Sequence, residues 1–182
     1  LLLTFDSKIP VSTKDGKSVD LGTELGRVLA ESDNEGAKVL AKLLPKPATD
    51  MLIFELPELD LSETVLVDPA GLSRKNKTSP RALASLLALA WNNPRLAALV
   101  AGLPVSGESG TMKKRAVNEP GSLLAKTGTL SGVNALAGIF QTSAGRAISF
   151  AILADAVPLE PGGTDKARKA IDQIATALVN AN

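Results

Sequence analysis

The chain has 182 residues, of which 45% are hydrophobic and 21% charged, so it is predicted to be a folded domain rather than a disordered segment. Its net charge is only +1 and its aromatic content 3%, which argues against a nucleic-acid-binding surface. Because it contains neither Cys nor His, these residues cannot supply a thiol nucleophile, a Ser-His-Asp triad or a Cys- or His-ligated zinc site. A hydrolase built from them would use Lys or a carboxylate as its general base, and we expect no cofactor and no metal.

The first third of the chain predicts one strand and two helices. Residues 1–5 (LLLTF) are apolar but too short to cross a membrane, and we interpret them as the middle of a strand. Since the chain lacks an initiating Met and a signal peptide, we interpret it as a fragment or a processed product. Helical spacing begins at Asp20, a suitable N-cap, and runs to residue 30. A second short helix is predicted over residues 37–44, ended by the prolines that follow. No long apolar segment occurs elsewhere, so no membrane span is expected.

The middle of the chain predicts a strand, a turn and two helices. Residues 64–67 (TVLV) are predicted to form a buried strand that leads into a turn over residues 68–71. Ser79-Pro80 is a typical helix start, with Ser as N-cap and Pro in the first turn. A second short helix is expected over residues 95–101, and a glycine-rich loop over residues 102–111.

The last third predicts a strand, a hairpin and a terminal helix. A strand over residues 122–126 is expected to end at Thr127-Gly128, and residues 134–141 and 147–154 to form a hairpin. Thr164 is a candidate cap for the last helix. The apolar stripe of that helix is predicted to comprise Ala167, Ala170, Ile171, Ile174 and Leu178. This order of elements predicts an α/β (α+β) fold in which helices cover an antiparallel sheet.

Two short motifs are candidates for catalysis. Ser32-Asp33-Asn34 falls at a helix junction and Lys126-Thr127-Gly128 at the end of a predicted strand. Each alone is explained as well by a helix cap, an Asx-turn or a glycine turn. In this order, however, they match the Ser-Asp-Asn and Lys-Thr-Gly motifs that accompany Ser-x-x-Lys in class A β-lactamases and penicillin-binding proteins.

The side chains of the two motifs suit a common reaction. Ser32 could pass a proton to a leaving amine nitrogen, and the amide of Asn34 could bind a peptide carbonyl. Lys126 offers a positive charge for a substrate carboxylate. Gly128, which has no Cβ, would let a substrate lie against the strand.

Three further segments make the resemblance specific. Residues 68–76 (DPAGLSRKN) resemble the Asp-Gly-Ser-Gly-Leu-Ser-Arg segment of the class C low-molecular-mass penicillin-binding proteins, the D-Ala-D-Ala carboxypeptidase/endopeptidase family. Residues 103–112 resemble that family's Leu-Pro-Val-Ala-Gly-x-x-Gly-Thr-Leu stretch, and residues 125–130 its third motif. The resemblance extends from about Asp20 to the C-terminus. It implies the C-terminal part of one penicillin-recognising, transpeptidase/β-lactamase-like domain over residues 1–182, with 1–18 as the end of a preceding inserted region.

The resemblance also implies roles for individual residues. Ser32 and Asn34 would belong to the second catalytic motif and Lys126 to the third. Thr127 and Thr129, with Gly128 between them, would bind the terminal carboxylate of the substrate, and the Thr129 N–H would form half of an oxyanion hole. The implied protein is a serine-type DD-peptidase that hydrolyses peptidoglycan stem peptides in the periplasm or cell wall and is acylated by β-lactams.

One element of the family pattern is absent. No Ser-x-x-Lys occurs in these residues, and the nearest candidate, Ser73, is followed three positions later by Asn76. The stretch between Asn34 and Asp68 is also short for the family. We therefore expect the nucleophile in an N-terminal part outside this chain. The alternatives are a catalytically inactive relative that binds peptidoglycan and a serine β-lactamase. A Ser-x-x-Lys upstream would distinguish an enzyme from the inactive relative.

Overall fold

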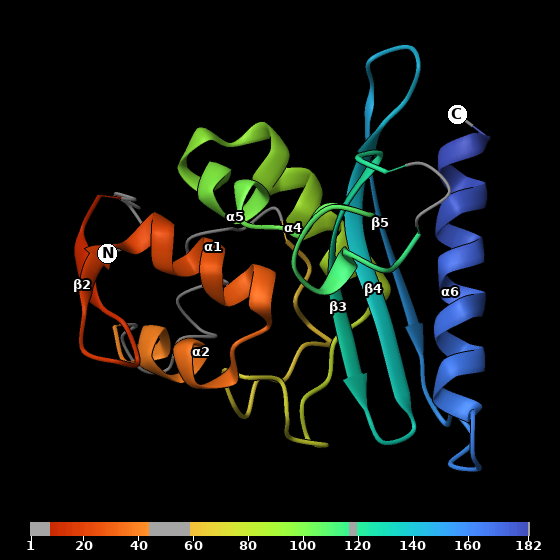
Figure 1. The fold of residues 1–182 in the computed structure, drawn as a ribbon, viewed down its shortest axis with the longest axis horizontal. Coiled ribbons are helices and arrows are strands. Elements are labelled where there is room, and N and C mark those ends of the chain that lie inside the picture. Colours follow the sequence, from red (N-terminus) through yellow and green to blue (C-terminus); the bar gives the residue numbers. More distant parts are fainter. Residues whose placement is uncertain (1–7, 44–58, 117–119, 182) are drawn as a thin grey trace.

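The computed structural model of the chain describes residues 8–43, 59–116 and 120–181 (Figure 1). The strand predicted over residues 1–5 lies outside these ranges, as do the prolines expected to end the helix over residues 37–44. In chain order the described elements are β1 (Pro10–Ser12), β2 (Ser18–Asp20), α1 (Leu21–Glu31), α2 (Asn34–Ala41), α4 (Pro80–Asn92), η2 (Pro94–Leu96), α5 (Ala97–Ala101), η3 (Gly110–Met112), β3 (Leu123–Leu130), β4 (Val133–Gln141), β5 (Ala147–Ala154) and α6 (Gly163–Asn180).

A three-stranded antiparallel sheet, in the order β3-β4-β5, forms the centre of the fold. β4 pairs along its length with both neighbours, from Val133↔Leu130 onwards on one side and up to Gln141↔Ala147 on the other. Helix α6 covers one face of this sheet, and α4 and α5 lie on the opposite side (Figure 1). The predicted α/β (α+β) architecture, an antiparallel sheet covered by helices, is therefore confirmed.

Two apolar clusters join the helices to the sheet. On the α6 side, Leu136 and Phe140 of β4 pack with Ile171. On the other side, Ile139 of β4 packs with Leu87 of α4. Successive side chains of a strand point to opposite faces, so β4 contributes alternately to the two clusters and is the most buried strand.

The β1–β2 hairpin, α1 and α2 lie to one side of the sheet, and α1 contacts α5 and η3 where glycines allow a close approach (Figure 1). A Cβ on Gly102, which follows α5, would lie 2.8 Å from the Cα of Gly26 in α1. Gly110 opens η3 with φ 50°, and a Cβ there would overlap the carbonyl of Ala30. Only glycine allows α5 and η3 to approach the C-terminal half of α1 this closely.

The helix starts agree in part with the sequence. α4 begins after Ser79, whose hydroxyl accepts a backbone N–H of the first turn, as predicted. α2 begins at Asn34, earlier than the predicted Ala37, because the preceding aspartate caps it. α6 begins at Gly163, so Thr164 lies inside the helix and is not its cap. The helix predicted over residues 95–101 is divided between η2 and α5.

The predicted buried strand over residues 64–67 is wrong. Only Val65 forms a bridge, to Lys77, and the apolar side chains of this segment are 47–53% exposed. The N–H of Val67 is bound by the side-chain oxygen of Asn76 at 2.7 Å instead of by a neighbouring strand. The apolar run therefore lies on the surface of the described part of the chain.

The predicted end of the strand over residues 122–126 is also wrong. Lys126-Thr127-Gly128 lies within β3, which continues to Leu130, since Gly128 pairs in register with Ala135 of β4. The turn comes later, at Gly132, where φ is 75°. Lys126 thus lies in the middle of a strand, where pairing with β4 at the residues before and after it fixes its backbone.

The buried face of α6 differs from the predicted stripe. Ile171 is buried, but Ile174 and Leu178 are 49% and 37% exposed. The helix packs on the sheet through Ile171, Ala175 and Val179 instead, so the apolar contacts of α6 lie on another face than the predicted stripe. Beside this face, the guanidinium of Arg115 binds the carboxylate of Asp172 at 2.7 Å.

Candidate active site

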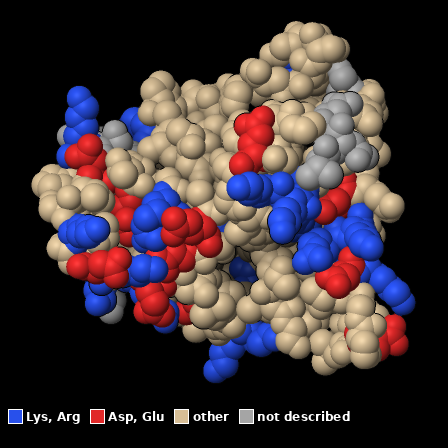
Figure 2. Space-filling model, in the orientation of Figure 1, with Lys and Arg blue, Asp and Glu red and all other residues tan. Residues whose placement is uncertain are grey.

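All six residues that the sequence singled out line one cleft of about 520 Å³. The cleft lies between the α1–α2 junction, the outer edge of β3 and the loop over residues 69–72. In the space-filling view, the charged side chains gather in two mixed clusters, one over the N-terminal elements and one on the side of α6, with a hollow between them (Figure 2). The candidate residues that line the cleft are Ser32, Asn34, Lys126, Thr127, Gly128 and Thr129.

Ser32 is the C-cap of α1 and has a left-handed backbone, with φ 55° and ψ 46°. A non-glycine residue in this region costs about 1–3 kcal/mol and persists only where its surroundings hold it. The Ser32 hydroxyl oxygen accepts a hydrogen bond of 2.7 Å from Lys126 Nζ. This contact joins the two sequence motifs across 94 positions of the chain.

Asn34 is the first residue of α2, and its position follows from the cap at Asp33. The Asp33 side chain accepts the backbone N–H groups of Glu35 and Gly36 at 3.1 and 3.2 Å. No other side chain within the described ranges binds the amide of Asn34, so this amide is available to a ligand in the cleft.

Lys126 is the cation of the cleft. Its Nζ donates to Ser32 Oγ and, at 3.0 Å, to the carbonyl of Thr127. Burial lowers the pKa of Lys126 below the ordinary value of lysine, and no carboxylate among the described residues forms a salt bridge with it. A partly desolvated ammonium that binds only neutral oxygens favours an anionic ligand.

Thr127 brings in a residue that the sequence analysis missed. Its hydroxyl donates a 2.9 Å hydrogen bond to the hydroxyl oxygen of Thr111, which also lines the cleft. Thr111 belongs to η3, held near α1 by the close contact of Gly110 described above. Its signal was present in the segment over residues 103–112, where the resemblance to the peptidase family includes a Gly-Thr pair.

β3 presents a free outer edge along the cleft. Its N-terminal part is covered there, because the Ala125 N–H donates to the carbonyl of Pro104 at 2.9 Å. The edge-facing groups of a strand repeat every two residues, so the N–H groups of Thr127 and Thr129 point to the same side. Among the described residues nothing pairs with them, and an extended peptide could add to this edge as a further strand. The hydroxyl of Thr129 donates to Asn134 Oδ1 at 3.5 Å.

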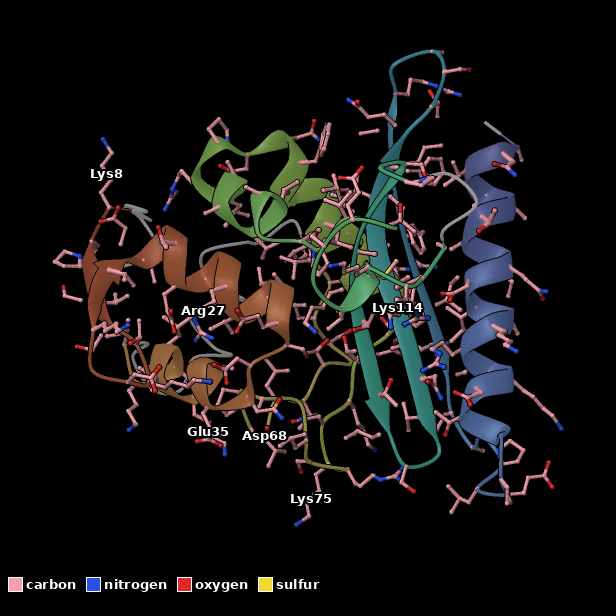
Figure 3. All side chains as sticks on the ribbon, in the orientation of Figure 1. Lys8, Arg27, Glu35, Asp68, Lys75 and Lys114 are labelled. Carbon is pink, nitrogen blue, oxygen red and sulfur yellow. The ribbon has the colours of Figure 1, made fainter. Side chains whose placement is uncertain are left out.

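Asp68 shapes the wall of the cleft opposite Ser32. Its carboxylate accepts the backbone N–H groups of Ala70, Leu72 and Ser73 at 2.7–3.1 Å and the amide of Asn76 at 2.8 Å. These bonds, led by that from Ser73, lower the pKa of Asp68 to about 2. The segment that resembles the peptidases is therefore a tightly bonded loop, and Figure 3 shows Asp68 between α2 and the lower end of the sheet.

The described residues contain no group of three or more His, Cys, Asp or Glu side chains that could hold a metal ion. Nor does any described helix combine the length and hydropathy that a membrane-spanning segment requires. The chemistry available to the cleft is thus that of an ammonium, hydroxyl groups, an amide and backbone N–H groups.

Known proteins share both the sequence and this architecture. Residues 12–178 match the sequence pattern of the D-Ala-D-Ala carboxypeptidase 3 (S13) family. Carboxypeptidase DacB of Mycolicibacterium smegmatis is 34% identical over 181 residues, which cover 89% of this chain and 38% of that protein. Penicillin binding protein 4 of Haemophilus influenzae, solved in complex with a β-lactam, superimposes with a TM-score of 0.71 at 26% identity, covering 91% of this chain and 43% of that chain.

A further solved structure concerns the fold alone. The extended-spectrum β-lactamase TLA-3 superimposes with a TM-score of 0.69 at 18% identity, over 91% of this chain and 66% of that chain. The fold is therefore of the penicillin-recognising, β-lactamase-like kind, and the chain spans less than half the length of the two carboxypeptidase relatives. Since the family match covers nearly all of its residues, the chain belongs to the D-Ala-D-Ala carboxypeptidase 3 (S13) family.

Proposed function

We propose that this chain forms the proton-transfer and carboxylate-binding side of the active site of a serine-type D-Ala-D-Ala carboxypeptidase, with endopeptidase activity as a second reaction of the same site. The substrate is a peptidoglycan stem peptide outside the cytoplasm. The observation that supports this most directly is the 2.7 Å hydrogen bond from Lys126 to Ser32, inside a cleft that also holds Asn34 and Thr127. The chain is the C-terminal part of the catalytic domain, and the Ser-x-x-Lys nucleophile that it lacks belongs to another part of the full-length protein.

The geometry of the cleft suggests how the substrate binds. The terminal carboxylate of the peptide meets the ammonium of Lys126 and the Thr127–Thr111 pair of hydroxyl groups, whose free hydrogen is that of Thr111. The backbone of the peptide follows the free edge of β3, which brings its scissile carbonyl to the N–H of Thr129. On the opposite wall, the amide of Asn34 binds a second carbonyl of the stem peptide.

Proton transfer follows from the bond between Ser32 and Lys126. The Ser32 oxygen accepts a hydrogen from Lys126, so its own O–H is free to donate to the leaving amine nitrogen. As that proton leaves, the ammonium of Lys126 stabilises the negative charge that develops on the Ser32 oxygen through the same hydrogen bond, and the proton taken from the nucleophile restores the Ser32 hydroxyl.

β-Lactams are proposed as inhibitors on the same grounds. In a penicillin, the carbon attached to the β-lactam nitrogen carries a carboxylate. In the stem peptide, the carbon attached to the scissile amide nitrogen carries one too, and in both ligands this nitrogen is the leaving group. The Haemophilus influenzae relative was solved with a β-lactam bound, which supports the proposal for this chain.

A binding protein without turnover is the second candidate, favoured by the absence of Ser-x-x-Lys from these residues.

Substitution of Lys126 in the full-length protein tests the proposal. Lys126→Ala should slow both D-Ala release from a stem pentapeptide and acylation by a fluorescent penicillin by about ten- to a hundredfold, since a charge-assisted hydrogen bond contributes about 1.5–3 kcal/mol. Lys126→Arg keeps the charge with a wider head group and should retain part of the activity. Lys38→Ala, which removes an exposed ammonium of α2, is the matched control.

The result is decided on folded protein, checked by circular dichroism. If the alanine variant is acylated by penicillin at the parental rate, Lys126 is only a surface charge and the proposed site is refuted. A parental protein that binds penicillin reversibly, with no covalent label and no D-Ala release, would identify the binding protein instead.

A further inference from the structure

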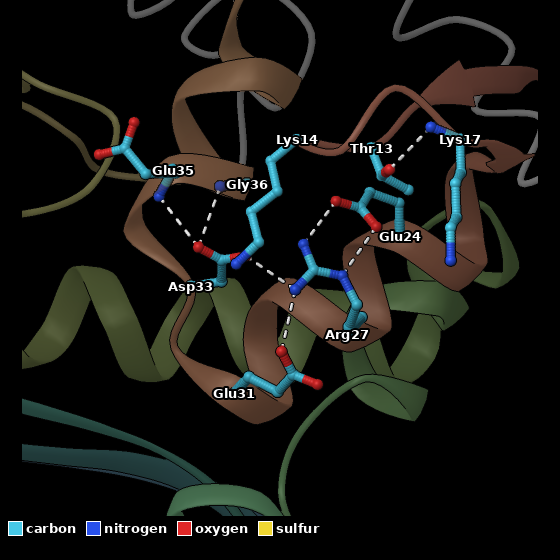
Figure 4. Close-up of polar contacts among 9 residues, drawn as sticks. All are labelled: Thr13, Lys14, Lys17, Glu24, Arg27, Glu31, Asp33, Glu35 and Gly36. Atoms are coloured by element: carbon cyan, nitrogen blue, oxygen red, sulfur yellow. Dashed lines mark hydrogen bonds and ion pairs between the residues drawn. The ribbon is translucent and has the colours of Figure 1, made fainter.

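A cluster of five charged side chains lies at the α1–α2 junction (Figure 4). Its centre is Arg27, which projects from α1 into the space between α1 and α2 (Figure 3). Of its described members, Asp33 alone also lines the cleft. We call this the Arg27 cluster, and its members are Lys14, Glu24, Arg27, Glu31 and Asp33.

The orientation of Arg27 is fixed by a buried partner. Its Nε and Nη2 donate to the two carboxylate oxygens of Glu24 at 2.9 and 2.6 Å, and Glu24 is only 1% exposed. A bidentate pair of this kind sets the plane of the guanidinium. Its Nη1 is thereby directed at Asp33, at 2.7 Å, and also reaches the exposed Glu31 at 2.9 Å.

Asp33 has every oxygen engaged. One accepts Arg27 and, at 2.8 Å, Lys14, while the other accepts the first backbone N–H groups of α2. Lys14 first, and then Arg27, holds the pKa of Asp33 below its usual range, so the carboxylate stays ionised. A negative charge at a helix N-terminus is also favourable. The residue between Ser32 and Asn34 is thus fixed from both sides.

Gly36 shows how tightly α2 is placed on this cluster. A Cβ at this position would lie 2.5 Å from a methyl group of Val28 and 2.8 Å from Arg27 Nη2. The first turn of α2 therefore rests directly on the guanidinium and on α1, a contact that only glycine permits. The end of α1, the junction and the start of α2 form one unit around Arg27.

Ser32 is the strained residue of this unit. Its left-handed backbone, without the glycine that usually occupies such a position, requires that both flanking helices be held in place. We propose that Arg27 is a positioning residue, which by holding Asp33 keeps Ser32 left-handed and its hydroxyl within hydrogen-bond reach of Lys126. Arg27 does not touch the substrate. The kinetic part of this inference rests on the proposed function, in which Ser32 transfers a proton.

A double-mutant cycle in the full-length protein tests the inference. Arg27→Met should lower the acylation rate at saturating penicillin by about tenfold or more, because small displacements of a catalytic group are costly. The penicillin concentration that gives half of the maximal rate should change by less than about threefold. In a Ser32→Ala background the same substitution should cause no further loss, because Arg27 acts through Ser32. Arg27→Lys should restore part of the rate, since one ammonium cannot bind Glu24 bidentately and Asp33 together.

Arg115→Met is the matched control. Arg115 forms a similar, largely buried ion pair with Asp172 of α6, and no described residue of α6 lines the cleft. The Arg115→Met substitution should lower the melting temperature while leaving the acylation rate at the parental value. If Arg27→Met does the same, or if its loss adds fully to that of Ser32→Ala, Arg27 has only a structural role and the inference is overturned.

Two further measurements keep the outcome clear. If Arg27→Met does not fold, Asp33→Asn, which keeps the cap but removes the charge, and Lys14→Met replace it in the same cycle. If the parental protein is not acylated at all, the proposed function fails, and crystal structures then test the positioning alone. The inference stands if Ser32 leaves the left-handed region in the variant, and falls if it keeps φ near 55° and its 2.7 Å contact with Lys126.

Discussion

Thr111 and Thr127 form a pair of hydroxyl groups at the rim of the cleft, and this pair carries the first residue-scale prediction. Thr127 donates to Thr111, which leaves the Thr111 hydrogen free to donate to a ligand carboxylate. Thr111→Val keeps the branched shape and removes this donor. Binding of penicillin to the full-length protein should weaken by about two- to tenfold, the range that one neutral hydrogen bond provides, with a smaller change in the acylation rate at saturation.

The chain offers a matched control for that substitution. Thr64 and Thr78 form another pair of hydroxyl groups, 3.3 Å apart, and neither lines the cleft. Thr64→Val therefore removes the same chemical contact away from the ligand and should leave binding unchanged. Equal effects of Thr111→Val and Thr64→Val would show that Thr111 has no contact with the ligand.

At the scale of elements, the loop over residues 69–72 depends on one carboxylate. Asp68 binds three backbone N–H groups and has its pKa lowered from 3.8 to about 2. A group with a lowered folded-state pKa stabilises the protein above its unfolded value, and the contribution is lost as the pH falls through the folded value. Asp68→Asn should therefore lower the melting temperature at neutral pH, and the difference from the parent should shrink between about pH 4 and pH 2.

Thermal unfolding over this pH range checks the prediction, together with hydrogen exchange of the loop amides. Exchange at Ala70, Leu72 and Ser73 should be faster in the variant at neutral pH, because an amide side chain offers one acceptor oxygen instead of two. A difference in melting temperature that stays constant down to pH 2 would mean that Asp68 is not the group responsible.

Also at this scale, the elements that local patterns describe well were predicted well. The start of α4 at Ser79-Pro80 and the β4–β5 hairpin depend on neighbouring residues alone, and both are confirmed. The face of α6 that is buried depends on the distant residues that it packs against, among them Leu136 and Phe140 of β4. The periodicity of the helix holds no information on those contacts, so the predicted stripe wrongly included Ile174 and Leu178, which are exposed.

At the scale of the whole molecule, the proposed division of the active site predicts a difference between two proteins. The 182-residue chain has Ser32 and Lys126 but no Ser-x-x-Lys, so by itself it should form no covalent adduct with a fluorescent penicillin. The full-length protein should be labelled. Gel fluorescence after denaturation measures both, with circular dichroism to establish that the short chain is folded. Labelling of the short chain would place a nucleophile within these residues.

The sequence by itself determined which chemical groups these residues can use and the order of the elements from α4 to α6. The absence of Cys and His, the Ser-Asp-Asn and Lys-Thr-Gly motifs and the start of α4 at Ser79-Pro80 are local properties, which need no knowledge of distant contacts. Tertiary structure alone decided that Lys126 meets Ser32, that Thr111 joins Thr127 and that Arg27 lies at the junction. These depend on how closely separate elements approach, which is set by glycine contacts such as those of Gly36 and Gly110 and by buried ion pairs. A contact between residues 94 positions apart leaves no periodic signal in a sequence, and packing is what creates it.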